Sequence, residues 1–156
     1  MLLAIGRLRD DPGTYENFDF SFAPADSGED CVLLTPVRAE GAVTFGGNAF
    51  LLSGCLKAAA RLICSRCLAD VQLDLSFDFE EEFDEQEYPG EDAELDMEDI
   101  ASQIWVSSIP MQVLCDDDCK GLCPTCGKNL NEGDCDCPKD EADPRLEALR
   151  SLLDQE

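Results

Sequence analysis

Ten cysteines stand out in this chain of 156 residues, and four of them have the spacing of a structural zinc site. The motif Cys-Pro-Thr-Cys-Gly at residues 123–127 has the form of a zinc knuckle, because two thiolates share one tight turn and the glycine permits the bend that follows. A Cys-Asp-Cys motif at residues 135–137 follows after a loop of turn-forming residues. The predicted ligands of a tetrahedral Zn²⁺ site are therefore Cys123, Cys126, Cys135 and Cys137.

Four further cysteines have spacing that allows a second metal site. Cys64 and Cys67 share one turn, and Cys115 and Cys119 lie just before the knuckle motif. Together the two pairs would complete a four-thiolate site that joins the C-terminal segment to the region around residue 64. In a rival partition, Cys115 or Cys119 replaces one cysteine of the Cys-Asp-Cys pair, and the spacing leaves this open. The sequence thus predicts one zinc ion and allows a second.

Two other interpretations of the knuckle motif compete with zinc. Disulfides are disfavoured, because a Cys-x-Cys bridge strains the required Cα separation and a reducing compartment favours metal ligation. Iron in a rubredoxin-like centre stays open, since four sulfurs in a tetrahedron suit both metals. Only one Cys-x-x-Cys-Gly turn is present, whereas iron sites of this kind usually have two. Cys31 and Cys55 lie in apolar contexts and are expected to be buried as small hydrophobic residues.

The same residues argue against catalysis. The chain has no histidine, which removes the commonest general base and the nitrogen ligands of most catalytic zinc sites. A closed four-thiolate site leaves no coordination position for water or substrate. We therefore expect no enzyme. The alternative is a zinc-regulated thiol redox protein or stress switch in which Cys64 and Cys67 cycle, with Arg66 lowering a thiol pKa.

The elements that must position these cysteines are predicted to be mainly strands. Residues 18–22 and 71–79 alternate apolar and polar side chains with the period of a half-buried strand, and residues 31–39, 41–45 and 50–63 are interpreted as further strands. Gly46-Gly47-Asn48 supplies a turn before the last of these. The predicted fold is α+β: a β-rich antiparallel sheet or partial barrel with short helices and a C-terminal cysteine-rich zinc module.

Acidic residues dominate the segment that follows the strands. Twelve of the twenty residues at 80–99 are acidic and a Pro-Gly pair interrupts them, which indicates a solvated, mobile connector. A helix is predicted at residues 96–108, with Asp96 as its N-cap and Pro110 beyond its end. A short amphipathic helix should begin at Asp143-Pro144. The predicted division is a β-rich domain at 1–83 carrying Cys64 and Cys67, an acidic connector at 84–95, and a helix, zinc module and tail helix at 96–156.

The charge restricts the partners. With 11 basic and 35 acidic residues the formal net charge is −24, so a phosphate backbone is repelled and basic protein partners are favoured. We expect weak or no direct binding of nucleic acid and no binding to anionic membranes. No secretory signal pattern surrounds the apolar residues 1–5, and no stretch approaches the ~20 apolar residues of a membrane span. The expected location is the cytoplasm.

The assembled motifs resemble a known family. In chain order they are LLSG at 51–54, LICSRCL at 62–68, CKGLCPTCGKNLN at 119–131, CDC at 135–137 and DPRL at 143–146. They are similar to the YceD-like large ribosomal RNA subunit accumulation proteins of bacteria and plastids, formerly a domain of unknown function. The resemblance implies a role in 23S rRNA accumulation and large-subunit biogenesis, and it brings no catalytic residues. Combined with the charge, it suggests a basic ribosomal protein or a pre-ribosomal particle as the partner.

Overall fold

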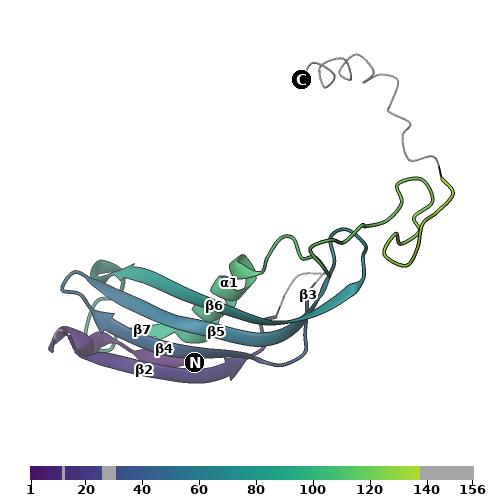
Figure 1. Cartoon of the computed structure of the whole chain (residues 1–156). Coiled ribbons are helices and arrows are strands. Elements are labelled where there is room, and N and C mark those ends of the chain that lie inside the picture. Colours follow the sequence, from purple (N-terminus) through teal and green to yellow (C-terminus); the bar gives the residue numbers. More distant parts are fainter. Residues whose placement is uncertain (12, 26–30, 138–156) are drawn as a thin grey trace, which may run out of the picture.

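The computed structural model describes residues 1–11, 13–25 and 31–137 (Figure 1). Antiparallel strands dominate this part of the chain, and one α-helix follows them. In chain order the elements are β1 (Leu2–Ala4), the 3₁₀ helix η1 (Gly6–Arg9), β2 (Tyr15–Phe22), β3 (Cys31–Leu33), β4 (Val37–Phe45), β5 (Ala49–Ile63), β6 (Asp70–Asp84), the 3₁₀ helix η2 (Glu85–Glu87), β7 (Glu94–Asp96) and α1 (Met97–Ser108).

Strand β5 is the centre of a five-stranded antiparallel sheet. All fifteen of its residues pair with β6 on one side. On the other side β5 pairs first with β4 and then, near its end, with the short β3, while β2 pairs with the outer edge of β4. The sheet is curved and open, so the antiparallel sheet among the predicted alternatives is confirmed and no closed barrel forms in the described chain (Figure 1).

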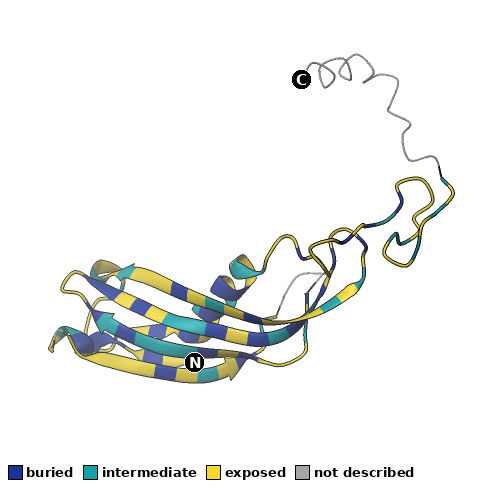
Figure 2. Ribbon diagram, in the orientation of Figure 1, coloured by how far each residue is buried: buried dark blue, intermediate teal, exposed yellow. Residues whose placement is uncertain are grey.

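Alternation of apolar and polar residues explains most of these strands. Inward residues of β5 such as Phe50, Leu52 and Leu56 are almost fully buried, and their neighbours along the strand face outward (Figure 2). The prediction of a strand through the three alanines at 58–60 is confirmed. The prediction of one strand over residues 31–39 is wrong in its bounds. The chain bends before Pro36, which cannot donate a ladder hydrogen bond, and β4 then continues through Gly41.

The helix α1 covers the inner face of the sheet together with the two-stranded sheet of β1 and β7. As predicted, Asp96 caps α1, and its carboxylate accepts a hydrogen bond from the Glu98 N–H at 3.1 Å. Trp105 is fully buried against Phe77 of β6, with ring centroids 5.3 Å apart. This packing fixes the end of α1, from which the cysteine-rich segment continues.

The acidic residues 80–99 do not form one connector without regular structure. β6 continues to Asp84, η2 follows directly, and β7 pairs with β1 at the N-terminus of the chain. Leu95 is fully buried and Ala93 nearly so, which places two apolar residues of this acidic run in the core. The boundaries of the predicted three-part division stay a prediction.

Two further expectations concern the chain outside the sheet. The predicted tail helix at Asp143-Pro144 lies outside the described residues. Within the described residues, no helix has both the length and the apolar character needed to cross a membrane.

Candidate metal centres

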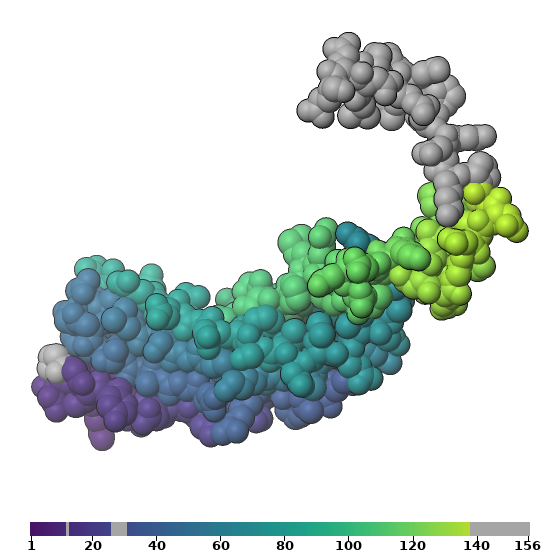
Figure 3. Space-filling model, in the orientation of Figure 1, coloured from purple at the N-terminus to yellow at the C-terminus, as the bar shows by residue number. Residues whose placement is uncertain are grey.

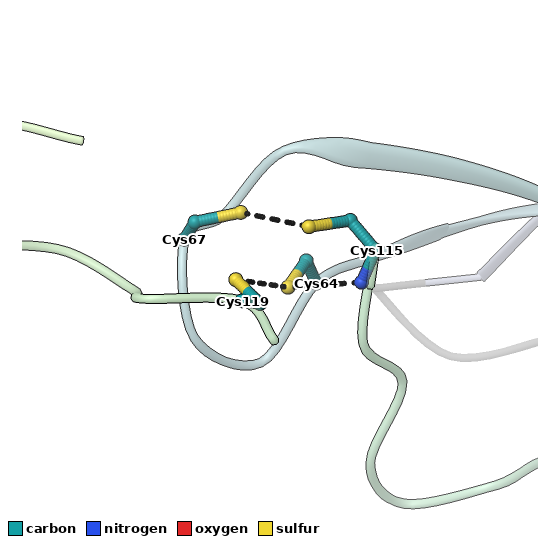
Figure 4. Close-up of side chains that lie close together, drawn as sticks. All are labelled: Cys64, Cys67, Cys115 and Cys119. Atoms are coloured by element: carbon teal, nitrogen blue, oxygen red, sulfur yellow. Dashed lines mark hydrogen bonds between the residues drawn. The ribbon is translucent and has the colours of Figure 1, made fainter. Parts of the chain in front are cut away.

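The first group of cysteines, here called the bridging cluster, joins the tip of the sheet to the segment after α1 (Figure 4). Its members are Cys64, Cys67, Cys115 and Cys119. Cys64 and Cys67 lie in the turn between β5 and β6, and the other two approach this turn from residues beyond α1. Three of the four side chains are buried, and Cys115 is exposed. The structure thus brings the four cysteines of the second predicted site together.

The spacing of the sulfur atoms fits one tetrahedral metal ion. The four Sγ atoms lie within 4.8 Å of one another, with Cys64 and Cys119 at 3.8 Å and Cys67 and Cys115 at 3.5 Å. Ligands ~2.3 Å from a tetrahedral zinc ion lie about 3.8 Å from one another. All ten cysteines are described and carry no disulfide. The bridging cluster could therefore hold a metal ion.

The second group, here called the knuckle cluster, consists of Cys123, Cys126, Cys135 and Cys137, whose Sγ atoms also lie within 4.8 Å of one another. The structure places Cys115 and Cys119 in the bridging cluster and not here, so the rival partition is wrong. The knuckle cluster is more open than the bridging cluster, since Cys126 is exposed and only Cys123 is buried. It lies in the segment that projects from the end of the sheet (Figure 3).

Both clusters begin with the same backbone turn. The Gly127 N–H donates to the Cys123 carbonyl at 2.8 Å, and the Leu68 N–H donates to the Cys64 carbonyl at 2.9 Å. Gly127 has φ +72° and Leu68 has φ +58°, so each residue after a Cys-x-x-Cys motif adopts the left-handed conformation. The sequence showed only one such turn, because Leu68 occupies a position where glycine is the expected residue.

In both clusters, hydrogen bonds lower the pKa of one thiol, and neighbouring sulfur atoms raise the pKa of another. Backbone N–H groups, foremost that of Cys67, lower the pKa of the Cys64 thiol to about 6, while the neighbouring Cys67 sulfur, with Cys119, raises the pKa of Cys115 to about 12. In the knuckle cluster, the Cys126 N–H lowers the pKa of Cys123 to about 6. At least one thiolate therefore forms readily in each cluster, but four together require a cation. A bound divalent metal would supply that charge.

Asn131 links the two clusters, and this role was not evident from the sequence, where it counted only as a turn former. Its side-chain N–H donates to the Cys119 Sγ at 3.3 Å, and its side-chain oxygen accepts from the Lys120 N–H at 2.8 Å. This hydrogen bond from the Asn131 side-chain amide lowers the pKa of the Cys119 thiol. Asn131 is therefore a positioning residue for the bridging cluster that is supplied by the knuckle loop.

Replacing Asn131 by alanine should weaken metal binding at the bridging cluster by about 10- to 100-fold, the usual cost of removing an outer-shell partner of a ligand. Zinc competition with a chelator of known affinity measures the effect. Glu132→Ala is the matched control, because the exposed Glu132 side chain accepts a hydrogen bond from the Asn129 side chain at 3.3 Å and contacts neither Asn131 nor a sulfur. Equal losses in the two variants would show a general effect of the loop.

The remaining two cysteines differ from each other. Cys31 is buried in the core of the sheet, as predicted, and burial raises the pKa of its thiol. The prediction that Cys55 is buried too is wrong. Cys55 lies on the outer face of β5, only half buried, with its Sγ 3.3 Å from the Ser76 Oγ. Side chains alternate along β5, and the inward ones near Cys55 belong to the even-numbered residues 50, 52 and 56, so Cys55 faces outward. The apolar residues around Cys55 in the sequence do not reveal which way it faces.

Comparison with known protein families gives a match to the chain. The family model described as "Large ribosomal RNA subunit accumulation protein YceD" matches residues 52–153, more than half of the chain. This range contains all eight cysteines of the two clusters.

Two curated relatives are similar to the chain. One is the large ribosomal RNA subunit accumulation protein YCED homolog 1, chloroplastic, of Arabidopsis thaliana, 35% identical over 72 residues, which is 46% of this chain but only 22% of that protein. The other is the protein YlbN of Bacillus subtilis (strain 168), 29% identical over 133 residues, covering 79% of this chain and 77% of the relative. No solved structure gives a significant match.

Proposed function

Because the chain belongs to the YceD family of large ribosomal RNA subunit accumulation proteins, we propose that it promotes 23S rRNA accumulation and biogenesis of the large ribosomal subunit. The observation that carries this proposal is the family match, which begins within β5 and extends through both cysteine clusters. The match therefore includes the joint between sheet and C-terminal segment, and not only the knuckle motif.

A non-catalytic role suits the residues that are present. The chain has no histidine, and each cluster offers four sulfurs, which saturate a tetrahedral ion. We infer that both ions are zinc and that they serve folding. Each zinc ion with four thiolates carries a net charge of −2 where four thiols carried none, so two sites lower the formal net charge from −24 to −28.

The proposed partner is a basic ribosomal protein, free or in a pre-ribosomal particle. An RNA backbone is repelled by this charge, whereas a basic protein is attracted. Three cations of β5 and the turn that follows it already have partners: Lys57 pairs with Glu40 at 2.6 Å, Arg61 with Asp70 at 3.7 Å, and the Arg66 guanidinium donates to the Cys119 carbonyl at 3.0 Å. They form no free basic patch for RNA.

Deletion of the gene tests the proposed function. In sucrose-gradient profiles we expect a lower ratio of 23S to 16S rRNA and fewer large subunits, restored by the full chain. Affinity capture with the zinc-loaded chain at low and moderate salt tests the partner. Enrichment of naked RNA without a basic ribosomal protein would contradict the proposed partner, and an unchanged rRNA ratio would contradict the function.

The thiol redox alternative rests on the lowered pKa of Cys64, since a thiolate is the reactive form. We expect that a thiol reagent finds only Cys31 and Cys55 reactive in the zinc-loaded chain, Cys55 much the faster because Cys31 is buried. A chelator should expose eight more thiols and release two zinc ions. One zinc ion with a fast-reacting Cys64 and Cys67 pair would instead favour the redox switch.

A further inference from the structure

Strand β6 is a long free edge of the five-stranded sheet. All fifteen of its residues pair with β5, and in the part of the chain that the structure describes no other strand pairs with it. β6 forms the margin of the sheet in Figure 1, and its teal atoms lie at the surface in Figure 3. An edge strand presents unpaired N–H and C=O groups to its outer side. β6 can therefore pair with one more strand.

Carboxylates line the outer face of the same strand. Asp78, Glu80 and Glu82 are all exposed, and they lie on one face because side chains alternate along a strand. Their opposite residues on β5 carry no positive charge: Cys55, Ser53 and Leu51. Within the described residues, no ion pair involves any of the three carboxylates. The three carboxylates of this row repel one another, and cationic side chains on a neighbouring strand would relieve the repulsion.

A pocket lies on the other face of β6, between its last residues and α1. It has a volume of about 370 Å³ and is lined by Glu81, Phe83, Ile100, Gln103, Ile104 and Ser107. Phe83 and Ile100 are only partly buried against the core, so apolar surface remains available in the pocket. Polar side chains of β6 and α1 lie around this apolar surface. The pocket suits a small apolar side chain from a strand added to β6.

We propose that the β6 edge at residues 78–84 accepts an extended basic segment of a partner protein as an added strand. Alternate side chains of that segment would be Lys or Arg beside the three carboxylates, and those between them would be apolar and enter the pocket. This inference rests on the proposed function, for which it specifies how the basic partner binds. A second copy of this chain is disfavoured, because two acidic rows would face each other, and RNA is repelled by the same row.

A peptide of ten residues that alternates lysine and valine, with blocked ends, is the probe. Titrated into the full, zinc-loaded, ¹⁵N-labelled chain, it should shift and protect amide signals of β6 and shift those of Ile100 and Ile104. Two control peptides carry backbone N-methyl groups, either on the lysines or on the valines. Alternate N–H groups of an extended peptide point to opposite edges, so each control peptide lacks the donors of one edge. The control that lacks the donors facing β6 should bind 10-fold or more weakly. Equal binding of all three peptides, or shifts confined to other acidic segments, would overturn strand addition.

Charge variants test the acidic row. Asp78→Asn, Glu80→Gln and Glu82→Gln together should weaken peptide binding 10-fold or more. The matched control changes three exposed glutamates away from this edge, Glu16, Glu91 and Glu94, to glutamine, and should weaken it less than 3-fold. Equal losses would contradict the proposed site. Displacement of the peptide by an RNA oligonucleotide, or self-association that only the triple β6 variant abolishes, would assign the edge to RNA or to a second copy.

Complementation separates this inference from the proposed function. If the peptide binds at β6 but the triple variant fully restores 23S rRNA in the deletion strain, strand addition stands and its link to ribosome assembly is wrong. If deletion lowers 23S rRNA but the peptide does not bind at β6, the proposed function stands and this inference is wrong. If the control variant restores 23S rRNA and the triple β6 variant does not, the result supports both the proposed function and this inference.

Discussion

Replacing Cys64 and Cys67 together by serine should abolish metal binding at the bridging cluster and release residues 109–137 from the tip of the sheet. Besides the metal ligands, the buried Val113 side chain and four hydrogen bonds hold this segment there. The Ser65 N–H donates to the Val113 carbonyl at 2.8 Å, the Val113 N–H donates to the Ser65 Oγ at 3.2 Å, the Leu122 N–H donates to the Arg66 carbonyl at 3.1 Å, and the Arg66 guanidinium donates to the Cys119 carbonyl at 3.0 Å. Each such bond contributes about 0.5–1.5 kcal/mol, whereas a structural zinc ion contributes ~10–16 kcal/mol in small peptides. A metal ion bound at the bridging cluster would therefore dominate this attachment.

Hydrogen exchange with metal analysis measures the release. Loss of even ~4 kcal/mol of that binding free energy speeds amide exchange about a thousand-fold, so amides at 113–122 should lose their protection. The pairing of β5 with β6 should persist, because it spans fifteen residues of each strand. The matched control removes the two other cysteines, as Cys31→Ala with Cys55→Ser, and should keep two zinc ions. Unchanged metal content and protection in the Cys64 and Cys67 double variant would contradict the bridging role.

The strands and the knuckle motif were predictable because both depend on neighbours close in the sequence. Alternation along residues 71–79 identified β6, and the spacing of Cys123 and Cys126 identified the first turn of the knuckle cluster. The partners of Cys115 and Cys119 were not predictable in this way. Their pairing with Cys64 and Cys67 crosses about fifty residues and depends on where α1 docks, which ligand spacing does not encode.

Three other features were not predicted, because the residues around them carry no local pattern that indicates them. β7 has a single buried residue, Leu95, within a run dominated by carboxylates, so its pairing with β1 has almost no local signal. Leu68 conceals the turn of the bridging cluster, since only its backbone conformation matches that of Gly127. The link from Asn131 to Cys119 also required the fold, because the two residues lie on opposite sides of the Cys-x-x-Cys turn. In each case a tertiary contact overrides a local pattern.

Replacing Trp105 by alanine should lower the free energy of unfolding by about 3–5 kcal/mol, the usual cost of truncating a fully buried large aromatic residue. Trp105 is completely buried on α1 and packs edge to face on Phe77 of β6. Its Nε1 has no hydrogen-bond partner among the described residues, so Trp105→Phe loses no hydrogen bond. The phenylalanine variant should therefore lose less than half as much stability as the alanine variant.

Urea unfolding of the zinc-loaded chain, followed by circular dichroism, gives these free energies, and it avoids fluorescence because Trp105 is the sole tryptophan. Val106→Ala on the same helix is the control, because its side chain is 49% exposed and should change stability by no more than ~0.5 kcal/mol. A loss below ~1 kcal/mol for Trp105→Ala would show that α1 is not anchored through this ring. Such a result would also remove the support for the pocket at β6, since α1 forms one of its walls.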